Sequence, residues 1–472
     1  MNILYKNLPR LTFTMTVLLT STAAFASSSS EKIALHLAES VRFKTISHQN
    51  LADFDHEPFE QHKQFLQDTY PEVFSQLEVQ WVNEYSLLIR WPGSDNSLNP
   101  MLFLAHTDVV PIEPGTESEW THPPFAGVIQ DGIVWGRGTL DDKVGVIGLL
   151  EAATALLKGN HKPTRDVYFA FGHDEEVSGT YGATAMAKIF SQRGINFEFI
   201  LDEGSAVVTD YPILPGKKVA TVNVSEKTYT TLTLTARGQG GHSSTPPKHT
   251  AIGTLAEALA KIEANPMPAR ITLPVQGMLE AFAPHVSGIQ SFIFNNLWLT
   301  KSLVINEMDK DPLTGAFIRS TSAVTMFNGG VKENVVPQIA TAKINFRLLP
   351  GDTKDDAIAH VRAVIQNDEI KITTSDWAIK SKIASTDNIG FKSIKTAVET
   401  VYPGSIVAPS LMFGATDSRM YNDLSDNIYR FHGMEITMKQ VGTIHGTDEH
   451  ISIDSMANAV EVAKQIIVNS SL

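Results

Sequence analysis

Residues 134–143 read Val-Trp-Gly-Arg-Gly-Thr-Leu-Asp-Asp-Lys, and the rest of the chain is organised around them. The apolar start of this stretch predicts the end of a buried strand, the two glycines allow a tight turn, and the alanine-rich run after Lys143 predicts a packed helix. Asp141 and Asp142 therefore lie where a strand passes into a helix N-terminus, and N–H groups there can fix the orientation of a carboxylate. This position suits a metal ligand, although an aspartate at a helix start is more often a simple cap.

The turn also resembles the Gly-x-Gly-x-x-Gly sequence of dinucleotide-binding folds. Its third glycine position is Asp141, whose charge would repel a pyrophosphate, so we favour a metal site over a nucleotide site. The formal net charge of −13 argues in addition against binding of nucleic acid. A hydrophobic content of 43% indicates a globular protein, and 472 residues are enough for two domains or for one domain with an insertion.

The N-terminus predicts a secretory signal peptide at residues 1–26. Lys6 and Arg10 precede an apolar, threonine-rich run, and Ala24-Phe25-Ala26 matches an Ala-x-Ala cleavage site. Cleavage after this site would give an exported protein, periplasmic or secreted, with a formal net charge of −15 instead of −13 because both cations leave. An uncleaved anchor is the alternative, but the run is short and interrupted, and we expect no membrane span in the mature chain.

The chain contains no cysteine. This excludes disulfides, thiolate zinc sites and a cysteine nucleophile, so any metal ion must be held by histidine, aspartate or glutamate. The sequence also lacks the Gly-x-Ser-x-Gly turn of serine hydrolases and the His-Glu-x-x-His helix of mono-zinc proteases.

Three predicted buried strands each lead into side chains that can bind metals. The strands cover residues 101–105, 166–171 and 197–201, and helices predicted at 143–158 and 184–192 separate them. Strands that alternate with helices form parallel sheets, whose strand ends share one edge, where sites form. The donors at these ends and elsewhere are His106, Asp108, Asp141, Glu175, Glu176, Asp202 and, remote in sequence, His445. One bridging carboxylate, with an imidazole and a further carboxylate on each side, would complete two open metal sites.

The pattern changes in the middle of the chain. Residues 229–236 alternate like a half-exposed antiparallel strand, which indicates a separate α+β domain. We therefore predict a catalytic domain in two parts, residues 31–223 and 379–472, with a lid domain inserted at 224–378. Within the insertion, the aromatic segment 282–298 predicts packing inside the lid, with a substrate pocket as the alternative.

Six motifs, in the same order along the chain, resemble those of one enzyme family. They are His106-Thr107-Asp108, Gly136 to Lys143, Asp174 to Gly179, Asp202-Glu203-Gly204, Gly241-His242-Ser243 and His445. By these motifs the chain resembles the co-catalytic di-zinc family of aminoacylases, desuccinylases and glutamate carboxypeptidases. Pro123-Pro124-Phe125 and Leu201-Asp202-Glu203-Gly204 are most similar to its branch of carboxypeptidase S and secreted N-acyl-amino-acid hydrolases. The resemblance implies an α/β fold, a zinc-peptidase-like α/β/α sandwich with an inserted, smaller α+β lid.

The resemblance also implies two zinc ions per subunit, with Co²⁺ or Mn²⁺ as substitutes. The ligands it implies are Asp141 as the bridge, His106 and Asp202 at one site, and Glu176 and His445 at the other. Asp108 would orient the His106 ring. Glu175 would be the general base that takes a proton from water and passes it to the leaving amine. The family further implies a cis peptide bond after Asp141.

Further residues, which are neither metal ligands nor their direct neighbours, are assigned by the same resemblance. His242 of the lid would reach the active site of a partner subunit in a homodimer and stabilise the oxyanion, with a simple turn as the alternative. Four residues resemble the family's binding set for the substrate carboxylate: Arg347, Arg419, Asn334 and Thr416. Arginine suits this role because its planar fork binds a carboxylate bidentately, although each arginine could equally form a surface ion pair.

Together these features predict an exported di-zinc amidohydrolase that cleaves an amide bond next to a free carboxylate. The substrate is a small blocked peptide, as for a Gly-X type carboxypeptidase, or an N-acyl amino acid, as for an aminoacylase. A non-catalytic binding protein on the same fold is the alternative from a different class, but every motif that could decay is intact.

Overall fold

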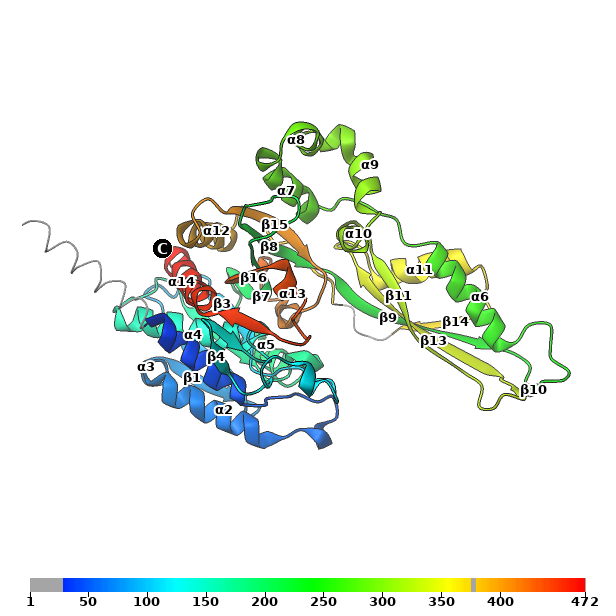
Figure 1. Ribbon diagram of the computed structural model, residues 1–472, viewed down its shortest axis with the longest axis horizontal. Helices are drawn as coiled ribbons and strands as arrows, with labels where there is room; N and C mark the ends of the chain where they lie inside the picture. The colour runs from blue at the N-terminus through cyan, green and yellow to red at the C-terminus, as the bar shows by residue number, and fades with distance from the viewer. Residues whose placement is uncertain (1–28, 375–378, 472) are drawn as a thin grey trace, which may run out of the picture.

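The computed structural model describes residues 29–374 and 379–471, so the signal peptide predicted at residues 1–26 lies outside the described residues. An eight-stranded sheet and a four-stranded sheet are the two largest in the described chain. Figure 1 shows the large sheet among its helices and the small sheet, with α6 (Ala251–Ala264) and α11 (Lys354–Ile365), extending away from it. The predicted α/β fold with an inserted α+β lid is confirmed.

The large sheet has the strand order β1-β2-β6-β3-β7-β16-β8-β15. At its centre β6, β3 and β7 are parallel neighbours, so the three strands predicted to share an edge do lie side by side. The strands are β1 (Glu78–Val82), β2 (Ser86–Trp91), β3 (Met101–His106), β6 (Val167–Gly172), β7 (Phe199–Val208), β8 (Val219–Glu226), β15 (Ile406–Met412) and β16 (Ile428–Ile436).

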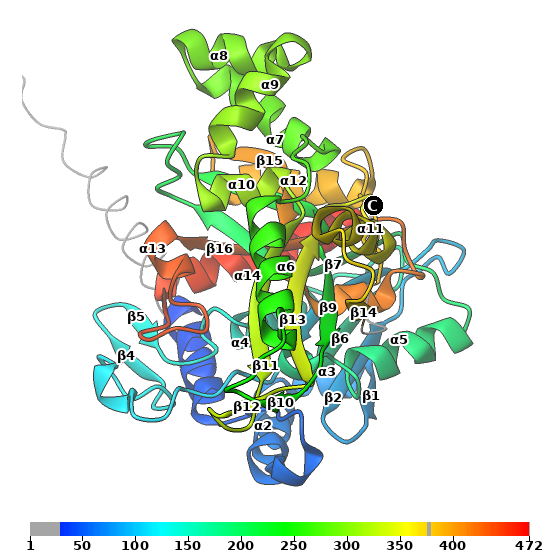
Figure 2. The same ribbon diagram turned by 90° about the vertical axis from the view of Figure 1, so that its right-hand side faces the viewer.

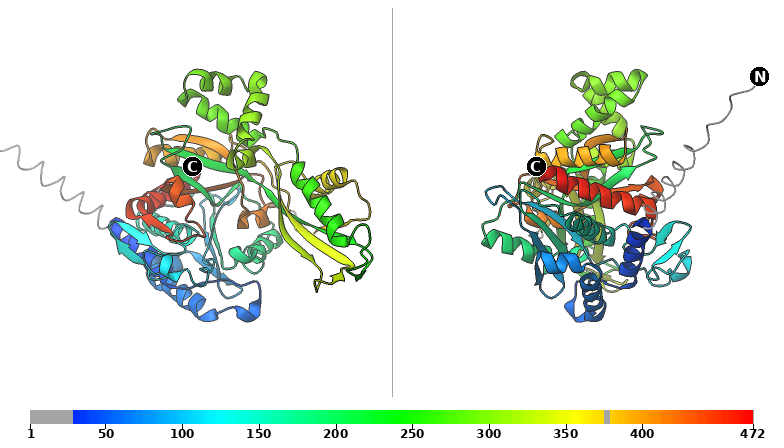
Figure 3. Two further views of the ribbon diagram at one scale, coloured as in Figure 1. Left: turned by 45° about the vertical axis from the view of Figure 1, so that its right-hand side comes forward. Right: turned by 90° about the vertical axis from the view of Figure 1, so that its left-hand side faces the viewer.

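Helices cover both faces of the large sheet, which explains why its central strands are apolar throughout. In β3, Phe103 and Ala105 belong to the core under three helices, whereas Leu102 and Leu104 belong to the core under a fourth. The alternation follows from strand geometry, which points successive side chains to opposite faces. The three helices are α4 (Lys143–Lys158), α12 (Ile389–Val401) and α14 (Ile453–Ser470), and the fourth is α5 (Ala183–Gln192). Figure 3 shows α14 beside α12 on one face of the resulting sandwich.

One predicted strand end is wrong. The sequence predicts that the third buried strand stops at residue 201, but β7 continues well beyond it. Its pairing with β16 shifts register between Asp202 and Ser205, so Glu203 and Gly204 form a bulge. Gly204 has a φ of +149°, which a residue with a side chain rarely adopts. Because a bulge interrupts the alternation of side chains, the sequence pattern hides the continuation of the strand.

The small sheet is antiparallel and has the order β11-β13-β9-β14. α6 and α11 cover one face, where Leu232 and Leu234 of β9 are buried, while alternate residues of the strand point away. β11 is an edge strand, and a two-stranded ribbon of β10 and β12 lies at the far end of this unit (Figure 1). The strands are β9 (Thr228–Arg237), β10 (Gly241–His242), β11 (Thr321–Gly329), β12 (Val335–Val336), β13 (Ile339–Leu348) and β14 (Lys371–Thr374).

Part of the insertion packs on the large sheet instead of the small one. α7 (Leu273–Phe282) contacts β15, and the chain then continues into α8 (Gly288–Asn295) and α9 (Leu297–Met308). α8 and α9 stand out from the body in Figures 2 and 3, and we call them the helical projection. Phe294 is buried in the projection, but Trp298 is exposed, so the predicted inward packing of the aromatic segment holds only in part. α10 (Pro312–Ile318) leads back to β11.

The domain boundaries at residues 224 and 379 stay a prediction. In the structure β8 remains in the large sheet up to Glu226, and β9 opens the small sheet at Thr228. The second boundary adjoins residues 375–378, which lie outside the described residues.

A three-stranded sheet brings the quoted turn beside the C-terminal part of the chain. It contains β4 (Val128–Gln130), β5 (Ile133–Trp135) and β17 (His450–Ser452), with β5 in the middle. The remaining helices are a helix at residues 29–42, α2 (His56–Thr69), α3 (Pro71–Gln76) and α13 (Met438–Val441). Among the described residues, no helix combines the length and the hydrophobicity needed to cross a lipid bilayer.

Candidate metal centre

The turn between β5 and α4 presents Asp141 beside the carboxyl end of β3. Gly136 and Gly138 have φ values of +146° and +91°, which explains why glycine occupies both positions. Asp142 caps α4 by accepting the N–H of Gly145, so the cap interpretation applies to this residue and leaves its neighbour free for another role. The peptide bond between the two aspartates is cis, as predicted.

Asp141 lies between two imidazoles. Its Oδ1 is 2.9 Å from His106 Nε2, and its Oδ2 is 2.9 Å from His445 Nε2. Each imidazole belongs to a group of three residues whose donor atoms lie within 4.8 Å of one another: His106, Asp141 and Glu203 in one group, and Asp141, Glu176 and His445 in the other. We call the five residues of these two groups the metal group. It contains four of the five predicted ligands, including the remote His445.

The chemistry of these donors fits divalent cations. Burial raises the pKa of Glu176 and that of Glu203, and the nearby Asp141 carboxylate raises both further. Glu176 Oε1 is buried and accepts no well-aligned hydrogen bond from a described residue, although His445 Nε2 lies 3.2 Å away. The neighbouring carboxylates of Asp141 and Glu176 raise the pKa of His445 to about 10, so a metal ion would displace a proton from it. Imidazole and carboxylate ligands without thiolates suit catalytic zinc and related ions.

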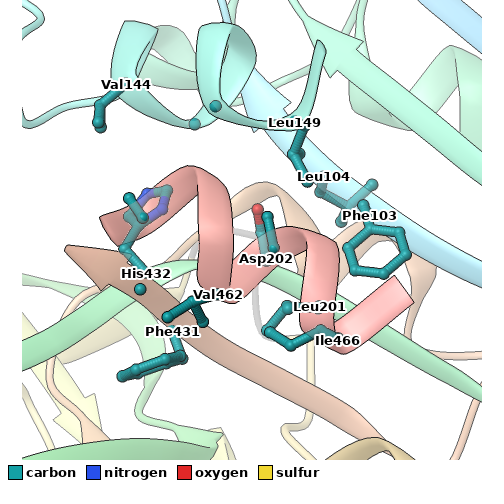
Figure 4. A pocket seen from close by; sticks show the side chains of 15 residues that line it. Phe103, Leu104, Val144, Leu149, Leu201, Asp202, Phe431, His432, Val462 and Ile466 are labelled. Carbon is teal, nitrogen blue, oxygen red and sulfur yellow. The ribbon is translucent and has the colours of Figure 1, made fainter. Parts of the chain in front are cut away.

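Asp202 is in neither group, contrary to the prediction that it completes the His106 site. Its Oδ1 accepts the N–H of Glu203 at 2.9 Å, and its Oδ2 accepts the N–H of Ser418 at 2.7 Å. The side chain lines a cavity of about 40 Å³ among apolar residues and His432 (Figure 4). The bulge in β7 explains the difference, because it brings the following residue to the metal group instead. We propose Glu203 in place of Asp202 as the ligand at the His106 site.

Separate replacement of these two neighbours distinguishes the ligand sets. We expect Glu203→Gln to bind one metal ion fewer per chain, because an amide is a weaker ligand than a carboxylate. We expect Asp202→Asn to keep its ions but to lower the free energy of unfolding by about 1–3 kcal/mol, because an amide NH₂ cannot accept a backbone N–H. Metal analysis and thermal unfolding measure the two effects. If Asp202→Asn loses an ion and Glu203→Gln does not, the ligand is Asp202 and not Glu203.

Asp108 connects the metal group to the predicted base. His106 Nδ1 lies 3.0 Å from the backbone oxygen of Asp108 and 3.3 Å from its Oδ1. The buried carboxylate also accepts the backbone N–H groups of Glu175 and Glu176, both at 3.1 Å, and the hydroxyl of Ser47 at 2.6 Å. One side chain therefore orients the imidazole and fixes the backbone of both glutamates.

Glu175 is half-buried, and a cation and another acid influence its charge. Burial and then the Asp417 carboxylate raise the pKa of Glu175 well above its ordinary value, which suits a proton acceptor in catalysis. Arg419 Nη1 is 3.5 Å from Glu175 Oε1 and donates to the backbone oxygen of Thr416 at 2.6 Å.

A second arginine lies near Arg419. The Arg347 guanidinium stacks over the Tyr229 ring, 4.9 Å from its centroid. Burial and the positive charge of Arg419 lower the pKa of Arg347, so the two guanidinium groups are close enough to repel each other. A pair of cations held this way favours binding of an anion such as a carboxylate.

Of the three remaining predicted residues, Thr416 contacts Arg419 through its backbone oxygen only, and the other two lie elsewhere. Thr416 is fully buried, and its hydroxyl pairs with that of Ser418 at 2.5 Å. His242 and Asn334 lie together at the far end of the small sheet, where the Ser243 N–H donates to the Asn334 backbone oxygen (Figure 1). The ten residues of β9 alone span about 30 Å between this end and Tyr229. His242 and Asn334 are therefore distant from the arginine pair of their own chain.

Sequence analysis missed Glu449, which is fully buried beneath the turn. Its Oε1 accepts three backbone N–H groups, those of Gly138, Leu140 and Asp141, and its Oε2 accepts from Arg137 at 2.6 Å. Glu449 therefore fixes the turn that presents the Asp141 carboxylate. An acid four positions after His445 is its sequence signal, and no spacing rule connects it to a turn about 300 residues earlier.

Comparisons with known proteins find similar sequences and a similar fold. The sequence of residues 102–469 matches that of peptidase family M20/M25/M40. The probable carboxypeptidase S-like 2 of Dictyostelium discoideum is 39% identical over 453 residues, which cover 95% of this chain and 86% of that protein. The N-fatty-acyl-amino acid synthase/hydrolase PM20D1 of Xenopus tropicalis is 37% identical over 411 residues, which cover 86% of this chain and 80% of that protein. The M20 family metallo-carboxypeptidase Sso-CP2 from Sulfolobus solfataricus has a similar fold, with a TM-score of 0.67 at 17% identity over 92% of this chain and 98% of that one.

Proposed function

Since the chain belongs to peptidase family M20/M25/M40, we propose that it hydrolyses an amide bond next to a free carboxylate, with metal ions held by its two ligand groups. The observation that carries this proposal is the single carboxylate of Asp141 between two imidazoles. The half-buried Glu175 lies 3.5 Å from Arg419, and the charge of Arg419 acts in turn on Arg347. A metal group, a proton acceptor and an anion site are the parts that such a reaction needs.

We propose zinc as the ion, two per chain, with Co²⁺ or Mn²⁺ as substitutes. Asp141 would bridge the ions, with His106 and Glu203 completing one site and Glu176 and His445 the other. Bound ions of this kind polarise a carbonyl and lower the pKa of water.

In this proposal Glu175 moves the proton. Its carboxylate accepts a proton from the attacking water and passes it to the leaving amine. Asp108 keeps the base in place by its hydrogen bond from the Glu175 N–H. Arg419 and Arg347 bind the substrate carboxylate, which places the neighbouring amide bond at the base.

Two substrate classes fit these parts. A small blocked peptide with a free C-terminus is the substrate of a Gly-X type carboxypeptidase, and the name of the Dictyostelium relative favours this class. An N-acyl amino acid is the alternative, favoured by the name of the Xenopus relative. Both carry a free carboxylate next to the scissile amide, so the arginine pair serves either one.

Hydrolysis by the purified mature protein separates these classes. N-protected Gly-Leu is compared with a long-chain N-acyl-phenylalanine, each with and without a chelator. Chelator-sensitive cleavage of the peptide identifies a carboxypeptidase, and preference for the acyl compound identifies an N-acyl-amino-acid hydrolase. We expect added Zn²⁺ to restore the activity that the chelator removes. Failure on both substrates by metal-loaded protein would refute the proposal and favour the binding protein.

We also propose a homodimer in which His242 of one chain serves the metal group of the other. His242 is exposed at the far end of the lid, where its own metal group is out of reach. The edge strand β11 exposes Met326 and Phe327 and offers an unpaired edge to a second copy. His242 would then donate a hydrogen bond to the oxyanion of the partner's substrate.

Mixing of two inactive variants tests the shared site. We expect His242→Ala and Glu175→Gln to be inactive alone, and a refolded equal mixture to recover about a quarter of the native activity, because half of the dimers contain one complete site. Steady-state hydrolysis of the preferred substrate measures the recovery. A mixture that stays inactive although mixed dimers form would contradict a role of His242 in the partner.

We further propose export to the periplasm or the medium, on the strength of the predicted signal peptide. Sequencing the N-terminus of the protein from its native host should find Ser27 as the first residue. An intact N-terminus on the active protein would contradict cleavage.

A further inference from the structure

The helical projection carries a group of exposed apolar side chains. Five of them, each between 52% and 83% exposed, come from two consecutive helices: Ile289, Phe292, Trp298, Leu299 and Leu303. Figure 2 shows that α8 and α9 lie at the outermost end of the molecule, beyond α7. Apolar side chains gathered on one protruding element indicate an interaction surface.

These side chains are not needed for packing within the chain. The inner side of the projection is filled by other residues, with Phe294 and Val304 buried against Phe282 of α7. A groove of about 410 Å³ between α7 and the projection leaves one side of Trp298 open as well. α9 therefore carries large apolar side chains on its outer as well as its inner side, next to exposed Lys301 and Glu307.

The charged residues of the helical projection indicate which class of partner it can bind. Residues 281–300 contain no aspartate, glutamate, lysine or arginine, although 19% of the chain is charged. Beyond this run, α9 exposes one cation and one anion, Lys301 and Glu307, so the projection has no excess charge of either sign to attract a charged partner. A chain with a formal net charge of −13 is in addition repelled by anionic lipid headgroups. A surface of zwitterionic lipid matches both properties.

The size of the exposed apolar surface also favours lipid over a protein partner. A stable protein–protein interface uses about 20–30 residues from each side, whereas the projection offers five large apolar side chains. Hydrocarbon buries such side chains without needing a complementary surface, and tryptophan is favoured at the level of the headgroups.

We propose that the helical projection docks on a membrane of zwitterionic lipid, with Trp298 and its apolar neighbours inserted among the headgroups. α8 and α9 then lie in the plane of the membrane surface, and the rest of the protein stays in water. This docking is independent of the catalytic reaction, so it can be tested on protein that has no substrate.

Flotation of the mature protein with phosphatidylcholine vesicles tests the proposal. We expect the native protein to float with the vesicles, and the double variant Ile289→Ser/Trp298→Ser to bind about tenfold more weakly or less. The matched control Leu35→Ser/Leu51→Ser removes two leucines that are 59% and 55% exposed in the N-terminal part of the chain, and it should bind like the native protein. Added phosphatidylglycerol should weaken binding because of the negative charge of the protein.

Several results would overturn the proposal. They are failure of the native protein to float, equal binding by the projection variant, and equal loss of binding in the control variant. A change of oligomeric state in the projection variant, measured by sedimentation without lipid, would assign the face to contact between copies of the chain instead. As a check on depth, Trp298→Phe should keep binding but lose most of the quenching of tryptophan fluorescence by brominated lipid. Unchanged quenching would mean that Trp298 stays in water.

Discussion

Glu175→Gln is expected to lower kcat by about 10²–10⁴-fold while the metal content stays unchanged. The side chain is half-buried, and burial and then the Asp417 carboxylate raise its pKa well above the ordinary value, which suits a group that accepts a proton. Glutamine has nearly the same shape but cannot accept a proton from water. The backbone bond from Glu175 N–H to Asp108 remains in the variant, so the neighbouring ligand keeps its place.

Kinetics and metal analysis on the same preparation measure this effect. Glu369→Gln makes the same change at an exposed position of the small domain, and it should leave both quantities at their native values. If Glu175→Gln turns over at the native rate, Glu175 is not the base. If the loss of activity is accompanied by loss of metal, its role is to hold the metal group.

Asp141→Asn is expected to remove both metal ions and all measurable turnover. Its two carboxylate oxygens face different imidazoles, so one substitution weakens both ligand groups at once. In contrast, a change at Glu176 or at Glu203 touches a single group. We expect the affinity for the metal to fall by more than the 10- to 100-fold that is typical for changes outside the ligands themselves.

Competition with a chelator of known affinity measures the loss at each site. Asp131→Asn is the matched control, because Asp131 is exposed in a turn of the same segment, where its positive φ also suits asparagine. A variant Asp141→Asn that keeps one ion at the native affinity would show that this carboxylate serves one site and does not bridge two.

The central part of the fold could be predicted from the sequence because its signals are local. A short apolar run such as residues 101–105 is typical of a strand with both faces covered, and helices between such strands favour a parallel arrangement. These rules place His106 and the Glu175–Glu176 pair at one edge without any knowledge of distant contacts.

The rest of the site depends on contacts that the sequence does not encode locally. His445 reaches Asp141 from the C-terminal part of the chain, and its place follows from the resemblance and not from spacing. The choice between Asp202 and Glu203 depends on a bulge, since two extra residues in β7, Glu203 and Gly204, interrupt the alternation of its side chains, and Glu203 is the neighbour that reaches the metal group. Asn334 resembled a carboxylate-binding residue, but the register of the small sheet carries it to the far end.

The buried pair of Arg137 and Glu449 has a consequence for the biogenesis of the protein. Synthesis proceeds from the N-terminus, so the turn that presents Asp141 leaves the ribosome about 300 residues before the acid that anchors it. Until the last segment has emerged and folded back, the bridging carboxylate has no fixed position and His445 is missing. We therefore expect a chain that ends before this segment to have no hydrolytic activity.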